Sequence, residues 1–188
     1  PTVTSIDSQE VAINPYAPFT TSTLIQSFST SFGWTASKTM KTAQDLYEAG
    51  NISYMRTDSP IMAKEALTAV RDIIENEYGV DYLHPSVRFY SAQKGAQEGH
   101  ECCRPTDFSA KHVSGSGDAQ KMYEMIWRRA IASQMSSGND RRLKATTKIS
   151  DYNFISRGNV RLFDGFRKVW TYAKHDDVIL PELKKGEK

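Results

Sequence analysis

The sequence predicts an α+β fold, mainly α, in which a helical unit is inserted between two stretches of β structure. Residues 2–13 are rich in β-branched side chains and show no helical period. Between residues 21 and 135, apolar side chains recur at helical spacing, and beyond residue 144 the pattern becomes strand-like again. We therefore expect the two ends of the chain to belong to one sheet.

The first predicted helix covers residues 21–32, where apolar residues repeat at helical spacing, and Gly33 ends it. Thr35 suits the N-cap of a second helix. Its expected buried stripe consists of Met40, Ala43, Leu46 and Tyr47. Gly50 fits the left-handed position that ends this helix.

A third helix is predicted to begin with Ser59 as N-cap and Pro60 at the first helical position, and to run to Gly79. Residues 80–118 are rich in loop-forming residues and include a Ser-Gly-Ser-Gly run. A fourth helix, from residue 118 to about 135, is apolar on several sides, so we expect it to be well buried.

The C-terminal part is expected to form strands. Residues 144–156 are predicted as one strand, followed by a turn at residues 158–159. Residues 160–163 and 166–172 are predicted as further strands around an Asp-Gly turn at 164–165.

The composition excludes several classes of protein. A length of 188 residues, 39% hydrophobic and 24% charged, fits one globular domain or two small ones that share a core. The sequence has no signal-peptide pattern and no apolar run near the roughly 20 residues that span a bilayer, so a membrane or secreted protein is not expected. The neighbours Cys102 and Cys103 cannot form a disulfide framework or a Cys-x-x-Cys metal site, and no metal site is predicted. The net charge of +2 neither establishes nor excludes a nucleic-acid partner.

The segment 52–59 connects two predicted helices and contains a candidate nucleophile. In an extended segment Tyr54 and Arg56 lie on the same face. A phenol has a pKa near 10, and a neighbouring guanidinium favours the phenolate and can hold a phosphate oxygen as charge builds. The pair therefore suits attack on a phosphodiester. The alternative is a buried tyrosine beside a surface ion pair of Arg56 with Asp58.

Two further features fit contacts with phosphate. In the polar segment 96–106, His100 could donate to a phosphate or pass a proton, and Arg104 could bind a neighbouring phosphate. The alternative is a structural histidine in a loop. Residues 121–148 hold seven basic residues against Glu124 and Asp140, which suits either a solvated face or phosphate contacts. The seven are Lys121, Arg128, Arg129, Arg141, Arg142, Lys144 and Lys148.

Four motifs in order closely resemble the type IA DNA topoisomerases. They are Pro-Phe-Thr-Thr-Ser-Thr-Leu at 18–24, the helix at 39–50, Ile-Ser-Tyr-Met-Arg-Thr-Asp-Ser at 52–59, and the segment 96–105. The residues of the first and third motifs resemble bacterial topoisomerase I more than topoisomerase III. Matches at residues 127–128, 163–166 and 180–184 extend the resemblance nearly end to end.

The resemblance implies an enzyme that relaxes negatively supercoiled DNA by cutting one strand, passing another and religating, without ATP. Tyr54 would attack the strand and become joined to its 5′ phosphate, Arg56 would stabilise the phosphate and the phenolate, and His100 would contact the phosphate. Looser matches imply supporting or DNA-contacting roles for Gln44, Tyr47, Asp58 and Arg104. From the basic stretch we add Arg128 and Arg129 as expected DNA contacts.

The resemblance also implies a domain organisation. Residues 21–138 would form a helical, catabolite-activator-like domain bearing the tyrosine, and residues 1–20 and 139–188 would be part of a β-rich arch domain. The expected partners are single-stranded DNA, negatively supercoiled duplex DNA and the remaining domains of the same polypeptide. We expect the enzyme to be cytoplasmic and associated with the nucleoid.

The sequence departs from the family in two ways. The Asp-x-Asp module that would bind Mg²⁺ in the complete enzyme is missing, so we expect an excised fragment that binds single-stranded DNA, holds no cofactor and does not cleave alone. Cys102 and Cys103 stand where the family usually has small apolar residues, which suggests sensitivity to oxidation and altered packing behind His100.

Three alternatives stay open at this stage. Another tyrosine-dependent strand transferase would need an Arg-His-Arg set or a histidine triad, and neither is visible. A non-catalytic, helical DNA-binding module would not depend on Tyr54. A fragment of reverse gyrase would share the same motifs.

Overall fold

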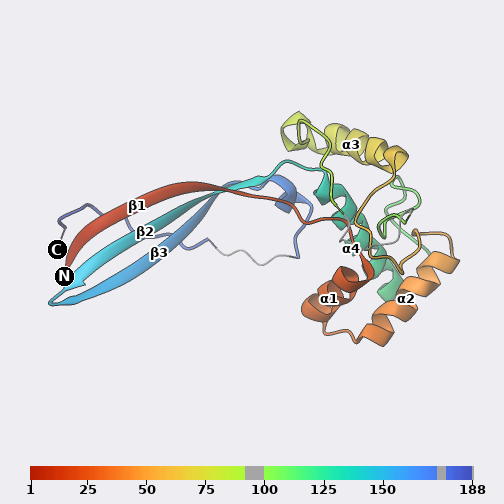
Figure 1. Ribbon diagram of the computed structural model, residues 1–188, viewed down its shortest axis with the longest axis horizontal. Coiled ribbons are helices and arrows are strands. Elements are labelled where there is room, and N and C mark those ends of the chain that lie inside the picture. Colours follow the sequence, from red (N-terminus) through yellow and green to blue (C-terminus); the bar gives the residue numbers. More distant parts are fainter. Residues whose placement is uncertain (92–99, 173–176, 188) are drawn as a thin grey trace. The chain divides into compact units, whose positions relative to one another are not determined.

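The computed structural model describes residues 1–91, 100–172 and 177–187 (Figure 1). The chain divides into two compact units. The helical unit comprises Pro15–Ser136, and the sheet unit comprises Pro1–Asn14 together with Ser137–Lys188. Over the described residues there are four α-helices and one three-stranded sheet, which confirms the predicted mixture of helix and strand.

The helical unit is built around its last helix. Its elements are α1 (Thr21–Phe32), α2 (Ala36–Glu48), α3 (Lys64–Tyr78), the short 3₁₀ helix η1 (Val80–Tyr82) and α4 (Gly117–Ser133). Helix α4 lies between α3 and the α1–α2 pair (Figure 1) and contacts both α2 and α3. Because it has neighbours on several sides it is buried on several sides, as its sequence predicts.

The ends of α1 and α2 follow local rules. Thr20 and Thr23 form a reciprocal capping box at the start of α1, and the hydroxyl of Thr35 accepts the N–H of Lys38 at the start of α2. Gly33 and Gly50 have φ of 67° and 76°, so both are left-handed, as predicted for Gly50, and Gly33 ends α1 as expected.

The predicted buried stripe of α2 is wrong at Tyr47. This side chain is 40% exposed, Met40 is half-buried, and Thr39 takes the buried position instead. Helical spacing does not separate the two, because Thr39 and Tyr47 each lie four residues from the buried Ala43. Tyr47 lies in the last turn of α2, where its ring contacts the exposed Tyr54.

Helix α3 begins at Lys64 rather than directly after Ser59. The hydroxyl of Ser59 accepts the N–H of Ile61, which is a turn-like bond within the loop and not a helix cap. The carbonyl of Ile61 in turn accepts the N–H of Cys102 at 2.7 Å. Residues 59–63 therefore form a loop that hydrogen-bonds to Cys102, and the helix begins after it.

The sheet unit contains β1 (Thr2–Ile13), β2 (Gly138–Ile149) and β3 (Tyr152–Phe163), in antiparallel order β1-β2-β3 (Figure 1). Strand β1 pairs with β2 along its length, from Thr2 opposite Lys148 to Ile13 opposite Gly138. This pairing confirms that the two ends of the chain form one sheet.

The predicted turn at residues 158–159 is wrong, because both residues lie within β3. The chain turns at residues 150–151, where Ser150 has φ of 52°. Gly158 pairs with Leu143, and an added Cβ would lie 2.9 Å from Leu180 Cγ and from the Val178 carbonyl oxygen. The glycine therefore permits close packing of residues 178–180 on the strand.

The predicted strand at 166–172 is also wrong. After Gly165, at φ of 52°, the chain forms the 3₁₀ helix η2 (Gly165–Lys168). Its Arg167 makes two bonds to the Asp140 carboxylate, with Nη2–Oδ1 of 2.6 Å and Nη1–Oδ2 of 3.0 Å. Both side chains are almost fully buried. This buried ion pair draws the chain into a helical turn beside the start of β2.

No helix among the described residues is long and apolar enough to cross a membrane.

Candidate active site

The tyrosine segment, residues 51–59, alternates between buried and exposed side chains. Met55, Thr57 and Ser59 are 0%, 6% and 1% exposed, whereas Tyr54 is 44% exposed. Arg56 and Asp58 are exposed as well. Tyr54, Arg56 and Asp58 therefore share the outward face, as an extended segment predicts. The alternative of a buried tyrosine is wrong.

One side of the tyrosine segment is bonded to residues 101–106. The N–H of Ser53 donates to the carbonyl of Arg104 at 2.8 Å. The Ser53 hydroxyl donates to the carbonyl of Cys102 at 2.8 Å and accepts the N–H of Arg104 at 2.9 Å. Further along, the N–H of Thr106 donates to the carbonyl of Asn51. These bonds hold the residue before Tyr54 against the segment that follows His100.

The other side is bonded to the first turn of α1. The Thr21 N–H donates to the carbonyl of Thr57, and its hydroxyl donates to the carbonyl of Met55, both at 2.8 Å. The same hydroxyl accepts the N–H of Thr57. The backbone on both sides of Arg56 is thus fixed while the side chain projects. This is the preorganisation that positioned catalytic groups require.

Helix α2 adds an aromatic neighbour to Tyr54. The ring of Tyr47 meets that of Tyr54 edge-on, with centroids 5.2 Å apart and planes at 63°. One turn earlier on α2, the amide of Gln44 donates to Glu48 at 2.7 Å. The structure therefore brings Tyr47 together with Tyr54 and engages Gln44 within its own helix.

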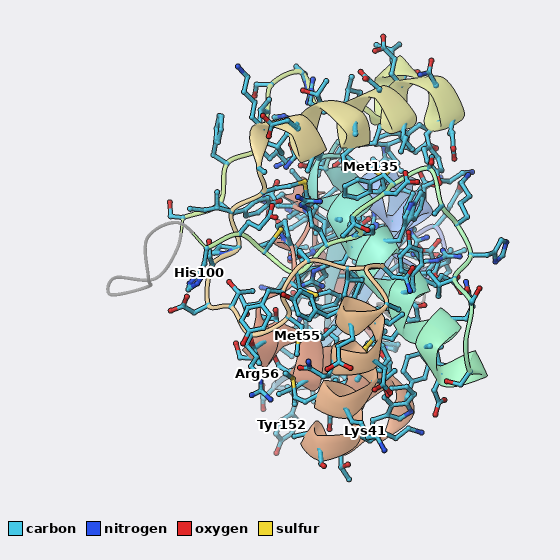
Figure 2. All side chains as sticks on the ribbon, turned by 90° about the vertical axis from the view of Figure 1, so that its right-hand side faces the viewer. Lys41, Met55, Arg56, His100, Met135 and Tyr152 are labelled. Carbon is cyan, nitrogen blue, oxygen red and sulfur yellow. The ribbon has the colours of Figure 1, made fainter. Side chains whose placement is uncertain are left out.

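His100 is exposed at the start of the bonded segment 101–106. Figure 2 shows His100 and Arg56 on the same side of the helical unit, with Met55 further in. Residues 96–99 of the predicted motif lie outside the described residues. The chain after His100 is held by backbone bonds from Cys102 to Ile61 and from Cys103 to Phe19.

The arginines that the sequence predicts as DNA contacts differ in which protein groups bind their guanidinium groups. Arg104 forms a bidentate pair with Glu101, and Arg128 pairs with Glu124 at 2.8 Å. Arg129 is only 7% exposed. Its guanidinium lies over the rings of Tyr16 and Phe19 and its Nε donates to a backbone carbonyl at 2.7 Å. Burial lowers the pKa of Arg129 to about 10. Arg129 therefore packs within the helical unit and does not offer its charge to DNA at the surface.

The two cysteines form part of the packing under this site. Both thiols are free and fully buried. Burial raises the pKa of Cys102 to about 12 and raises the pKa of Cys103 still further above its usual range. Because the thiolate is the reactive form, the expected sensitivity to oxidation is not supported.

The basic stretch continues onto the sheet as a cross-strand cluster. Arg142 and Lys144 are two residues apart on β2 and therefore lie on the same face, and Lys144 pairs with Arg157 of β3. These three side chains line a groove with Asp7 of β1. Arg157 is absent from the contacts predicted from the sequence, because a turn at 158–159 leaves it unpaired with β2. With the turn at 150–151, counting residues outward along both strands pairs Lys144 with Arg157.

Among the described residues, no three His, Cys, Asp or Glu side chains gather closely enough to hold a metal ion. The donors present in the described residues do not fit a Mg²⁺ site.

Comparison with known proteins gives consistent results. The sequence model of the DNA topoisomerase family matches residues 1–188. DNA topoisomerase 1 of Pseudomonas aeruginosa is 39% identical over 186 residues, covering 96% of this chain and 21% of that protein. The enzyme of the same name from Escherichia coli is 40% identical over 176 residues, covering 92% and 19%. This chain thus spans about a fifth of the length of these relatives.

Solved structures agree with the sequence comparison. Full-length topoisomerase I from Thermotoga maritima superposes with a TM-score of 0.83 at 29% identity, over 99% of this chain and 32% of that one. The match of the family model over the whole chain and the identity of about 40% to several relatives lead to one assignment. The chain belongs to the bacterial type IA DNA topoisomerase family.

Proposed function

We propose that this chain carries the nucleophile of a topoisomerase that relaxes negatively supercoiled DNA by cutting and resealing one strand. The observation that carries the proposal is the tyrosine segment. Tyr54 and Arg56 project from its exposed face, while hydrogen bonds from α1 and residues 101–106 hold its backbone.

The reaction requires one bond to form as another breaks. The phenolic oxygen of Tyr54 attacks a backbone phosphorus, and the bond from that phosphorus to the 3′ oxygen breaks. The phenol loses its proton to solvent, and the leaving oxygen takes one up to become a 3′ hydroxyl. Because the phosphotyrosine keeps the energy of the broken linkage, the hydroxyl can reverse the reaction without ATP.

Two side chains assist this exchange. Arg56, on the same face as Tyr54, supplies positive charge and a forked donor to the attacked phosphate as its charge builds. His100 lies on the same side of the unit as Arg56 (Figure 2), which supports its proposed role as a donor to a phosphate oxygen. We propose supporting roles for Gln44, Tyr47 and Asp58, of which Tyr47 contacts the ring of Tyr54.

DNA binding would draw on both units. In the helical unit we propose Arg128, which is part-exposed and forms an ion pair with Glu124 one turn away. In the sheet unit the cluster of Arg142, Lys144 and Arg157 supports contacts with phosphates. A DNA substrate of this kind places the enzyme in the cytoplasm, at the nucleoid.

We also propose how the two units relate to the family. The helical unit would be the catabolite-activator-like domain, and the sheet unit would be part of the arch domain into which it is inserted. The acidic module that binds Mg²⁺ would lie elsewhere in the same polypeptide, so this chain alone would bind single-stranded DNA without cutting it.

The test is a covalent-adduct assay with a single-stranded oligonucleotide labelled at its 3′ end. The chain is assayed alone, and then together with the acidic metal-binding portion and Mg²⁺, after association of the two portions has been verified. We expect a denaturant-resistant labelled band only in the mixture, and none with Tyr54→Phe. Tyr152→Phe is the matched control, since Tyr152 is more exposed than Tyr54, at 72%, but lies in the sheet unit.

Each other outcome has a definite meaning. An adduct from the chain alone would contradict the proposal that the acidic module lies elsewhere. No adduct in the mixture, with single-strand binding retained and unaffected by Tyr54→Phe, would favour a non-catalytic DNA-binding module.

A further inference from the structure

The guanidinium of Arg104 is already bound within the protein. Its Nε and Nη2 donate to the two carboxylate oxygens of Glu101 at 2.8 and 2.9 Å, and its Nη1 donates to the carbonyl of Pro105 at 2.8 Å. All three nitrogens therefore have partners. The side chain is 16% exposed and that of Glu101 is 34% exposed. A phosphate would have to displace a carboxylate of its own sign to reach this arginine.

The backbone of Arg104 has a second set of partners, in the tyrosine segment. Its N–H donates to the Ser53 hydroxyl, and its carbonyl accepts the Ser53 N–H. Ser53 directly precedes Tyr54, and Glu101 directly follows His100. The ion pair thus closes a short loop with one end beside the phosphate-contacting histidine and the other bonded beside the nucleophile.

We propose that Glu101 and Arg104 are positioning residues whose ion pair fixes His100 relative to Tyr54. Arg104 then acts through Ser53 and the loop, and it does not contact DNA. This inference rests on the proposed function of Tyr54. It assigns to Arg104 a role different from the phosphate contact that the sequence alone suggests.

The two roles predict different results for Glu101→Gln and Arg104→Gln in the complete enzyme. For positioning residues, both variants lower the cleavage rate at saturating single-stranded DNA, by about tenfold or more, because small displacements at a reacting centre are costly. Single-strand binding and its dependence on salt stay as in the wild type. Exchanging the two charges, Glu101→Arg with Arg104→Glu, restores part of the rate.

A DNA contact predicts the opposite pattern. Arg104→Gln would then reduce the slope of log affinity against log salt by about 0.7, the value for one phosphate contact on a single strand. Glu101→Gln would tighten binding by removing a repulsive charge and leave the saturated rate unchanged. Either result overturns the proposal. The proposal also fails if the double variant with exchanged charges cleaves no faster than the single variants while it unfolds at the same temperature as the wild type.

Two controls separate the possible failures. Glu77→Gln breaks an exposed pair with Lys111, of similar length at 2.6 Å, in the same unit, and should leave the cleavage rate unchanged. Tyr54→Phe should abolish cleavage. If the wild-type enzyme forms no adduct through Tyr54, the proposed function fails. If it does, and both Glu101→Gln and Arg104→Gln cleave at the wild-type rate, only the positioning role fails.

Discussion

The tyrosine segment and the β2–β3 hairpin both present charged side chains, but their backbones are held in different ways. The hairpin pairs two twelve-residue strands in a ladder with one irregularity, between Asn139 and Asp140, and half of its side chains are exposed. The tyrosine segment lacks regular structure. Side-chain and backbone bonds from Thr21 and Ser53 hold it in place, and buried side chains alternate with exposed ones.

The two regions therefore differ in what they can contribute: the tyrosine segment offers a fixed geometry and the hairpin offers positive charge. The tyrosine segment can hold a reacting group at a defined place because its neighbours bond to it at Ser53, Met55 and Thr57, and positioned catalysis requires such support. The hairpin offers a row of cations whose effect on DNA depends on their number and spacing more than on exact placement. We therefore expect substitutions in the first to change rates, and substitutions in the second to change affinity and salt dependence.

The largest expected effect is on stability, at the base of the sheet. Asp140→Asn leaves the guanidinium of Arg167 buried and uncompensated, which should lower the free energy of unfolding by about 3–5 kcal/mol. Urea denaturation followed by circular dichroism measures this. Arg141→Gln, which breaks the exposed pair with Glu10, is the control and should leave the unfolding midpoint unchanged. Equal, small shifts in both variants would show that the sheet unit does not depend on its buried pair.

In the tyrosine segment, Arg56→Gln should reduce the cleavage rate at saturating DNA by about 10²–10³-fold, the usual result of removing one preorganised donor to a charged transition state. Single-turnover cleavage by the complete enzyme measures the rate. Lys64→Gln removes an exposed cation of the same unit and should not change it. A rate for Arg56→Gln within a few-fold of the wild type would contradict the role of Arg56.

Thr21→Ala tests the support of that segment directly. It removes the hydroxyl bonded to Met55 and Thr57, and should destabilise the segment locally by about 1–3 kcal/mol. Faster hydrogen exchange at the Thr57 amide reports the loss. Thr21→Ser keeps the hydroxyl and should retain most of the protection. Unchanged exchange in the alanine variant would mean that other contacts hold the segment.

On the hairpin, Arg142→Gln and Lys144→Gln should each reduce the salt slope of single-strand binding by about 0.7. Affinity measured across a salt series tests this. The double variant should show about twice the change, because each side chain would meet its own phosphate. A slope that does not change would remove the sheet unit from the proposed DNA-binding surface.

The smallest effect concerns the two cysteines. Burial raises the pKa of Cys102 to about 12, so its thiol should react negligibly with a thiol-specific reagent at pH 8 while the protein is folded. Both cysteines should react after unfolding in urea. Rapid reaction of the folded protein would show that the packing beneath the tyrosine segment opens readily.

Local signals in the sequence were enough to predict much of this structure. Capping residues and glycines defined α1 and α2, and the alternating pattern around Tyr54 gave the face it shares with Arg56. The sequence ends were correctly predicted to form one sheet because β-branched stretches at both ends flank a helical middle. These features depend on residues close together along the chain.

The features that sequence analysis missed depend on distant contacts. The start of α3 is delayed by the bond from residue 61 to residue 102, and Gly158 is needed for packing under Leu180 rather than for a turn. The burial of Arg129 depends on two aromatic rings more than a hundred residues earlier. A basic residue in a helix looks the same in sequence whether its charge faces DNA or a neighbouring ring.

The central claim is that Tyr54 is the nucleophile, and mapping the covalent adduct tests it most directly. The complete enzyme is trapped on a 3′-labelled oligonucleotide and digested, and the labelled peptide is identified by mass spectrometry. The account predicts a nucleotide joined through its 5′ phosphate to Tyr54, in the peptide that also contains Ser53 and Met55. An adduct on any other residue, or one joined through a 3′ phosphate, would contradict it.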